Sequence, residues 1–130
     1  MKREIKFRGK DLRGQWQYGD LIHNDETDLL IRQGCINSFI ENETIGQFTG
    51  LKDKNGKEIY EGDIMQYNSL LRPEKYYRYV IAWNPIDMAF GCAGLAHAFL
   101  DCPDIGGGAQ ITDSTIIGNI HDNPELLTEK

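Results

Sequence analysis

The chain has 130 residues, a formal net charge of −6, and three cysteines, Cys35, Cys92 and Cys102. A chain of this length is near the commonest domain size and can fold as one domain without a disulfide or a structural metal. An odd number of cysteines without C-x-x-C spacing argues against a zinc module and a secreted disulfide framework. The amino terminus is too polar for a signal peptide, and no apolar run approaches the ~20 residues that cross a bilayer, so we expect a soluble cytoplasmic protein.

The charge is unevenly distributed along the chain. Residues 1–78 carry 13 basic and 13 acidic side chains, whereas residues 79–130 carry seven acidic side chains and one basic side chain. The amino-terminal segment is locally basic through Lys2, Arg3, Lys6, Arg8, Lys10 and Arg13. Such a segment is a candidate for phosphate contacts. Solvated charge, or pairing with the acidic carboxy-terminal region of the same or a neighbouring subunit, is the commoner explanation.

One pattern occurs twice. Residues 7–14, continuing through residues 18–22, are echoed by residues 48–56 and 60–65, and the alignment of the two copies needs two single-residue insertions. Each copy predicts a tight turn, a short strand, a Gly-Asp kink and a second strand. This pattern is typical of small β-barrels and is not a catalytic signature.

The first half of the chain predicts short strands. Residues 4–8 alternate charged and apolar side chains, a turn follows at residues 11–14, and residues 15–22 resume the alternation, which together predict a hairpin. Residues 29–31 predict a third, more buried strand that ends at Gly34. Residues 35–43 combine helical spacing with β-branched residues that also allow a strand or a loop, and we expect an irregular segment there.

The second half begins with the strongest hairpin signal in the chain, Asn55-Gly56, which follows β character over residues 44–50. Strands are predicted over residues 64–67 and 77–83, and the latter should be central, buried on one face and partly covered on the other. The elements that follow are strand pairs or a short helical turn over residues 88–100, a flexible loop at residues 106–108, a last strand over residues 111–121, and a short helix that begins at Pro124.

No catalytic or cofactor pattern emerges. The glycines at 106–108 lack phosphate-loop spacing and a following helix. The three histidines, none with a partner at i+3 or i+4, are His23, His97 and His121. Cys92, His97 and Cys102 are a conceivable metal set, although buried thiols and a surface imidazole are the commoner explanation. Residues 53–56 miss calcium-loop spacing and fit a hairpin turn. We assign no catalytic, cofactor-binding or metal residue, and expect a protein that is not an enzyme.

Aromatic side chains are a second group of candidate functional residues, after the titratable ones. Eight of them lie in or beside predicted strands: Trp16, Tyr18, Tyr60, Tyr67, Tyr76, Tyr77, Tyr79 and Trp83. Tyr and Trp anchor protein interfaces and stack on bases. Most of these residues are expected in the core or half-buried. Because alternation cannot bury all three tyrosines of residues 76–79, at least one should face solvent, a ligand or another subunit.

Three segments carry a resemblance to a known family: residues 4–9, 44–64 and 117–127. They closely resemble the YopX-like proteins of bacteriophages and prophages, whereas residues 66–115 match only loosely. The resemblance implies a phage or prophage protein that acts in the cytoplasm of the bacterial host, in a family without an established biochemical activity. It brings no catalytic residues.

Together these observations predict an all-β or β-dominated domain over residues 1–130. We expect a partly open SH3-like barrel around Gly62-Asp63-Ile64, with a hairpin portion over residues 1–60, a barrel-like portion over residues 61–130 and a short carboxy-terminal helix. The leading hypothesis for function is a non-enzymatic module that binds a host or phage protein, as a homo-oligomer and without a cofactor or membrane. The alternative is a small barrel that binds nucleic acid through the basic amino-terminal segment and exposed tyrosines, against which a pI near 5.0 weighs.

Overall fold

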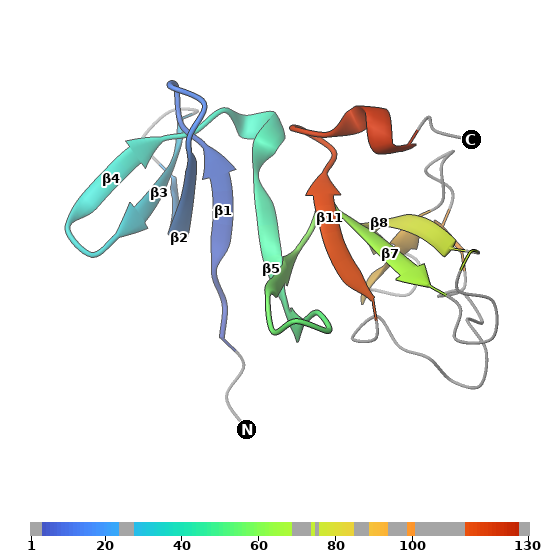
Figure 1. Ribbon diagram of the computed structural model, residues 1–130. Coiled ribbons are helices and arrows are strands. Elements are labelled where there is room, and N and C mark those ends of the chain that lie inside the picture. The colour runs from blue at the N-terminus through green and yellow to red at the C-terminus, as the bar shows by residue number, and fades with distance from the viewer. Residues whose placement is uncertain are drawn as a thin grey trace. The chain divides into compact units, whose positions relative to one another are not determined.

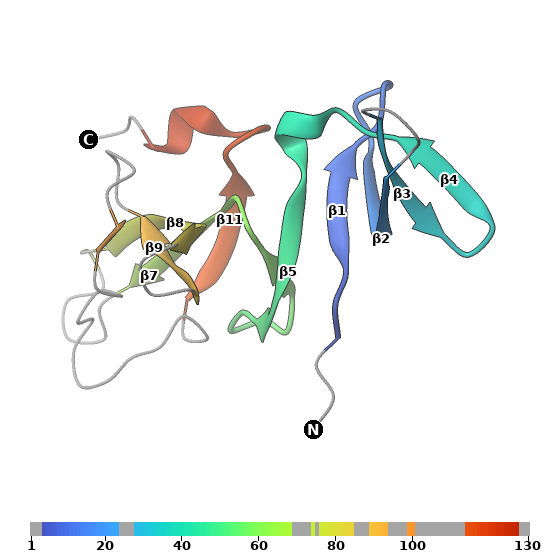
Figure 2. The ribbon, with the colours of Figure 1, turned by 180° about the vertical axis from the view of Figure 1, so that it is seen from behind.

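The computed structural model describes residues 4–23, 28–68, 74, 76–84, 89–93, 99–100 and 114–127. The described part is dominated by antiparallel strands, with short 3-10 turns and no α-helix among them, so the predicted β-dominated class is confirmed. The chain divides into two compact units, Met1–Gly50 and Leu51–Lys130. Figure 1 shows the strands of each unit, and Figure 2 shows them from behind. No helix in the described ranges is long and apolar enough to cross a membrane.

The strands that begin in the first unit belong to an antiparallel sheet with the order β4-β3-β2-β1-β5-β6. Its elements are β1 (Phe7–Lys10), β2 (Trp16–His23), β3 (Leu29–Gln33), β4 (Ile36–Phe39), the 3-10 turn η1 (Asn42–Thr44) and β5 (Gly46–Lys52). The predicted hairpin is present as β1 and β2, which pair with Arg8 opposite Tyr18. The predicted third strand is β3, and its Ile31 is fully buried. The first strand starts later than expected, since Ile5 precedes it and is exposed.

The segment expected to be irregular, residues 35–43, contains strand β4, so that prediction was wrong. Gly34 has a φ of +62° and turns the chain so that β4 pairs back along β3, with Ile36 opposite Gln33 and Phe39 opposite Leu30. Positive φ costs glycine little, which makes it suited to such a turn. The helical spacing of Ile36, Phe39 and Ile40 was therefore coincidental, because pairing with β3 decides the conformation.

The second unit holds a sheet with the order β10-β9-β8-β7-β11. Its elements are β6 (Glu58–Tyr60), β7 (Asp63–Asn68), β8 (Tyr76–Asn84), β9 (Ala89–Ala93), β10 (Phe99–Leu100), β11 (Thr115–Asn119) and the 3-10 turn η3 (Pro124–Leu127). The predicted strands at residues 64–67, 77–83 and 111–121 correspond to β7, β8 and β11. Of the segment 88–100, the described residues 89–93 and 99–100 are the paired strands β9 and β10. The glycine loop at residues 106–108 lies outside the described residues.

The middle of strand β8, residues 79–81, is buried on both faces. One cluster joins Ile59, Met65, Tyr79 and Ile81, with Ile116 packed against it. On the other face, Ile64 and Val80 form a second cluster, packed against by Ala82, Ile117, Ile120, Leu126 and Leu127. The sheet is therefore covered by β6 on one side and by η3 on the other. This burial confirms the central position predicted for the strand.

Gly62-Asp63 forms the predicted corner between β6 and β7. Gly62 has a φ of +94°, and the buried Asp63 carboxylate accepts a hydrogen bond from the Tyr60 N–H at 2.7 Å. The first copy of the motif behaves differently. Strand β2 runs continuously through Gly19, where a Cβ atom would collide with the Arg32 carbonyl oxygen of β3. The same dipeptide is thus a corner in one copy and a point of close strand approach in the other.

Two finer predictions of the fold are not met in the described part. Neither sheet closes into a barrel: the first begins at β4, and the second begins at β10 and ends at β11. The expected carboxy-terminal helix is the 3-10 turn η3, in which the Leu126 N–H bonds to the Asn123 carbonyl three residues earlier.

Candidate functional site

Each copy of the repeat contains a turn of the same kind, which is organised by an aspartate. The Asp11 Oδ1 atom accepts hydrogen bonds from the N–H groups of Arg13 and Gln15, each at 2.9 Å. The Asp53 Oδ1 atom accepts the equivalent bonds from Asn55 at 2.8 Å and Lys57 at 2.9 Å. An aspartate that bonds turn amides in this way organises the backbone. The residues that superficially resembled a calcium loop are therefore the scaffold of a hairpin turn.

The second carboxylate oxygen distinguishes the two turns. In the first copy, the Asp11 Oδ2 atom accepts from the Gln17 side-chain amide at 2.9 Å, within the same hairpin. In the second copy, the Asp53 Oδ2 atom accepts from the backbone N–H of Ile116 at 3.0 Å. The neighbouring Lys54 N–H donates to the Ser114 carbonyl at 3.0 Å. Asp53 therefore joins its turn to the edge of strand β11, 63 residues away in sequence.

Hydrogen bonding lowers the pKa of both aspartates below the usual value. For Asp11 the largest cause is the backbone N–H of Gln15, and partial burial opposes it. For Asp53 burial is the largest single influence and raises the pKa, but the N–H groups of Ile116, Lys57 and Asn55 outweigh it together. Hydrogen bonds to a carboxylate favour its charged form. Both groups are therefore structural anions and not proton donors.

Cationic and aromatic side chains alternate on one face of the first-unit sheet, where Arg8 and Phe48 are buried. Lys6, Arg8 and Lys10 alternate along and just before β1, so their side chains share a face. The Arg8 Cζ atom lies 4.6 Å from the centre of the Trp16 ring, and the Lys10 Nζ atom lies 5.6 Å from that centre. The Lys6 Nζ atom lies 5.2 Å from the centre of the Phe48 ring. The first unit thus aligns three cations with two aromatic rings, and we call this set the cation–aromatic face.

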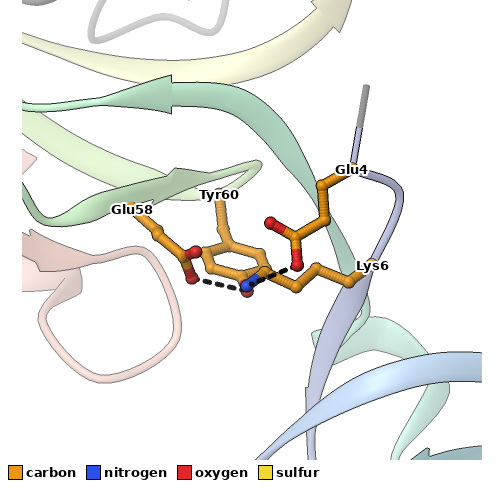
Figure 3. A network of polar contacts seen from close by, with 4 residues as sticks. All are labelled: Glu4, Lys6, Glu58 and Tyr60. Atoms are coloured by element: carbon orange, nitrogen blue, oxygen red, sulfur yellow. Dashed lines mark hydrogen bonds and ion pairs between the residues drawn. The ribbon is translucent and has the colours of Figure 1, made fainter. Parts of the chain in front are cut away.

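Lys6 also forms an ion pair in this region. Its Nζ atom is 3.4 Å from the Glu4 carboxylate, and the Glu4 side chain is largely exposed (Figure 3). Exposed ion pairs contribute little net stability. Figure 3 also draws the hydrogen bond of the second unit from the Tyr60 hydroxyl to the Glu58 carboxylate, 3.3 Å long. Tyr60 is buried, so this residue, a candidate for an interface in the sequence, is part of the core.

The remaining aromatic candidates divide between core and surface. Tyr67 and Tyr79 are buried, and the Tyr79 hydroxyl is 2.6 Å from the buried Ser114 hydroxyl. Tyr18, Tyr76 and Trp83 are 41%, 40% and 43% exposed. The Arg78 guanidinium lies over the Tyr76 ring at 4.8 Å. The expectation that at least one tyrosine of residues 76–79 faces outward is confirmed by Tyr76, while the Tyr77 side chain lies outside the described structure.

Strand β4 is a second candidate surface, which the sequence reading missed. It is the end strand of its sheet, as Figure 1 shows, and Ile36 and Phe39 are 69% and 50% exposed. Its four residues, Ile-Asn-Ser-Phe, carry no charge. The overlooked signal was Gly34 followed by a short uncharged run, which is also a hairpin pattern.

The conceivable metal set falls outside what the structure describes. His97 and Cys102 are not among the described residues, nor is the side chain of Cys92. Within the described ranges, no three His, Cys, Asp or Glu side chains are grouped so that they could hold a metal ion. Of the basic segment, Lys2 and Arg3 are likewise outside the described residues, and the exposed Arg13 lies in the turn after β1.

Comparison with known proteins places this chain among relatives. No curated protein matches it. The crystal structure of protein EF1440 from Enterococcus faecalis is similar, with a TM-score of 0.60 and 26% sequence identity over 97% of this chain and 99% of that chain. A family model described as YopX protein matches residues 5–128, nearly the whole chain. On that match, the chain belongs to the YopX family.

Proposed function

We propose that this protein is a non-enzymatic interaction module of a phage or prophage, which binds a protein partner in the cytoplasm of the bacterial host. The observation that carries the proposal is the uncharged edge strand β4, with two exposed apolar side chains. An edge strand presents unpaired backbone groups that another strand can complete. The aspartate turns, by contrast, serve the fold.

The backbone of β4 suggests a variant that separates binding from folding. In an antiparallel ladder, hydrogen-bonded and non-hydrogen-bonded pairs alternate. The Ile40 N–H bonds to the Leu29 carbonyl, so the alternation assigns Ile36 and Ser38 to bonds with β3 and turns the peptide groups of Asn37 and Phe39 outward. Proline at position 37 therefore removes an outward donor and leaves the bonds to β3 in place.

The proposal is tested by capture from a bacterial lysate with tagged wild type, Asn37→Pro and Asn37→Thr. Both variants lose the hydrogen bond from the Arg32 Nε atom to the Asn37 Oδ1 atom, but only the threonine keeps the outward N–H. We expect a defined partner that wild type and Asn37→Thr retain and Asn37→Pro loses. A partner retained equally by Asn37→Pro, or no partner at all, would refute the role of β4.

A second candidate function is nucleic-acid binding, which the cation–aromatic face favours. Arg8 and Lys10 lie beside Trp16, and Lys6 lies beside Phe48, which places cations and rings on one face of the sheet as single-strand binding requires. The test is fluorescence anisotropy with single-stranded DNA and RNA over a range of salt. The double variant Lys6→Gln/Lys10→Gln should reduce the salt slope by about 1.4, since each phosphate contact contributes roughly 0.7. Lys52→Gln/Lys54→Gln is the control of equal charge. Absence of binding at low salt would exclude this candidate.

A further inference from the structure

We propose that Asn55 is a site of spontaneous modification, at which ring closure with Gly56 converts the asparagine to aspartate or isoaspartate, and that the turn organised by Asp53 slows this reaction in the folded chain. The site lies in the second unit and does not involve β4. Asn55 is the only asparagine of the sequence that precedes a glycine. The first copy of the repeat has Arg13 before Gly14 at the matching place, so the site belongs to the second copy alone.

The chemistry needs only these two residues and water. The backbone nitrogen of Gly56 gives up its proton and attacks the Asn55 Cγ atom, so that a new C–N bond closes a cyclic imide and the side-chain nitrogen leaves as ammonia. Water then opens the imide at either carbonyl, which gives aspartate, or isoaspartate with the backbone running through Cγ. No oxidant or reductant is involved. Glycine favours the ring closure, since it has no side chain to shield its nitrogen and little restriction on its backbone.

Both residues are accessible for this reaction. Asn55 and Gly56 are exposed, and a Cβ atom added to Gly56 would meet no other atom within 4 Å. The Asn55 backbone N–H is bonded to Asp53, but in the described structure no hydrogen bond holds the Asn55 side-chain amide. Water therefore reaches the site, and the side chain can take up the rotamer that attack requires.

The turn opposes ring closure. The Gly56 N–H donates to the Asp53 carbonyl oxygen at 2.9 Å, which makes Asn55 residue i+2 of a β-turn, where ψ is about 0°. At that angle the Gly56 nitrogen eclipses the backbone nitrogen of Asn55 and not its Cβ atom. Attack on Cγ therefore requires rotation about the Asn55 Cα–C bond, and this rotation breaks the bond to Asp53. The N–H groups of Asn55 and Lys57, both held by the Asp53 Oδ1 atom, resist the same opening.

Isoaspartate at position 55 would loosen strand β11. It lengthens the backbone between the two N–H groups that share the Asp53 Oδ1 atom, so the carboxylate cannot hold both in the present geometry. It also places a second negative charge beside Asp53. The Oδ2 atom of the same carboxylate accepts from the Ile116 N–H at 3.0 Å. The modification is therefore expected to weaken the bond that joins this turn to β11.

Peptide mapping by mass spectrometry during incubation at mildly alkaline pH measures the reaction. Folded wild type should react about tenfold or more slowly than the same chain unfolded in urea, because the turn must open first. Asp53→Ala removes the acceptor of the flanking N–H groups and, when folded, should react several-fold faster than wild type. Asp11→Ala makes the equivalent change in the first copy and leaves residues 53–57 in place, so it should react like wild type. In urea all three chains should react alike.

Three results would overturn the proposal. An unmodified position 55 in unfolded wild type would exclude the site itself. Equal rates in folded and unfolded wild type would exclude protection by the turn. Equal acceleration by Asp11→Ala and Asp53→Ala would assign the protection to global stability and not to this turn. Circular dichroism establishes that each variant is folded, and if Asp53→Ala is not, Asp53→Asn, which keeps one acceptor oxygen, takes its place.

The modified protein provides the second measurement. Ion exchange separates it from wild type, since the product carries an additional negative charge. Hydrogen exchange at the Ile116 amide should be faster in the isoaspartate form than in Asn55→Asp, which carries the same charge on a backbone of normal length. An Ile116 amide that is equally protected in both forms would overturn the coupling to β11.

Discussion

The substitution Asp53→Asn tests whether Asp53 holds strand β11 in place. The carboxylate accepts three backbone N–H bonds, from Asn55, Lys57 and Ile116. An asparagine has one oxygen acceptor, so whichever way its amide is turned, its NH₂ group faces at least one of these N–H donors. Leaving a buried donor without an acceptor costs about 1–3 kcal/mol, and we expect the free energy of unfolding to fall by that amount.

Asp11→Asn is the matched control, because the same turn exists in the first copy. Here the second carboxylate oxygen faces the side-chain amide of Gln17 and not a backbone N–H. The Gln17 amide can rotate and present its oxygen to the new NH₂ group, so every donor keeps an acceptor. We expect a clearly smaller loss of stability than for Asp53→Asn.

Urea unfolding followed by circular dichroism measures the stability difference, and hydrogen exchange of the Ile116 amide reports the bond itself. Asp53→Asn should lower the midpoint and accelerate exchange at Ile116, whereas Asp11→Asn should leave Ile116 protected. Equal destabilisation by both variants, or an Ile116 amide that stays protected in Asp53→Asn, would refute the conclusion that the Asp53 carboxylate holds β11 in place.

Three further predictions concern acid stability, a glycine and a buried hydroxyl pair. The folded-state pKa of Asp53 lies below its unfolded value of about 3.9, so its contribution to stability is fully present above that pH and is lost as pH falls through the folded pKa. The free energy of unfolding of Asp53→Asn should therefore fall less steeply with acid than that of wild type. Gly19→Ala should destabilise the protein by more than Gly14→Ala in thermal unfolding, because both glycines have positive φ but only a Cβ at position 19 meets the Arg32 carbonyl; equal melting temperatures would contradict this. Tyr79→Phe should cost about 1–3 kcal/mol by removing the bond to Ser114, and Tyr79→Phe/Ser114→Ala should lose less than the sum of the two single variants, an expectation that additivity would contradict.

The repeat shows how one local pattern serves two structural ends. Each copy folds the same aspartate turn, because the turn is satisfied by bonds among residues only four apart. After the turn, the copies diverge at Gly-Asp. Gly19 lies within β2 and lets β3 approach, while Gly62 bends the chain into a second sheet. The glycine permits both outcomes, and the neighbouring strands select between them.

Some of this protein was determined by its sequence alone. The β-dominated class, the turns at Asp11 and Asp53, the corner at Gly62 and the burial of Ile31 follow from alternation and turn chemistry, which act over a few residues. Membership of the YopX family was likewise evident from the motifs before the fold was known, and the family match over residues 5–128 confirms it.

Other features were decided only by the tertiary structure. Strand β4 exists because β3 offers its edge, although residues 35–43 by themselves also have helical spacing. The bond from Ile116 to Asp53 and the stacking of Arg8 on Trp16 join residues that no local pattern connects. The choice between an open sheet and a closed barrel depends on which strand pairs at each edge. In such pairings, segments far apart in sequence compete for the same backbone hydrogen bonds. Short-range periodicity does not indicate which segment will pair.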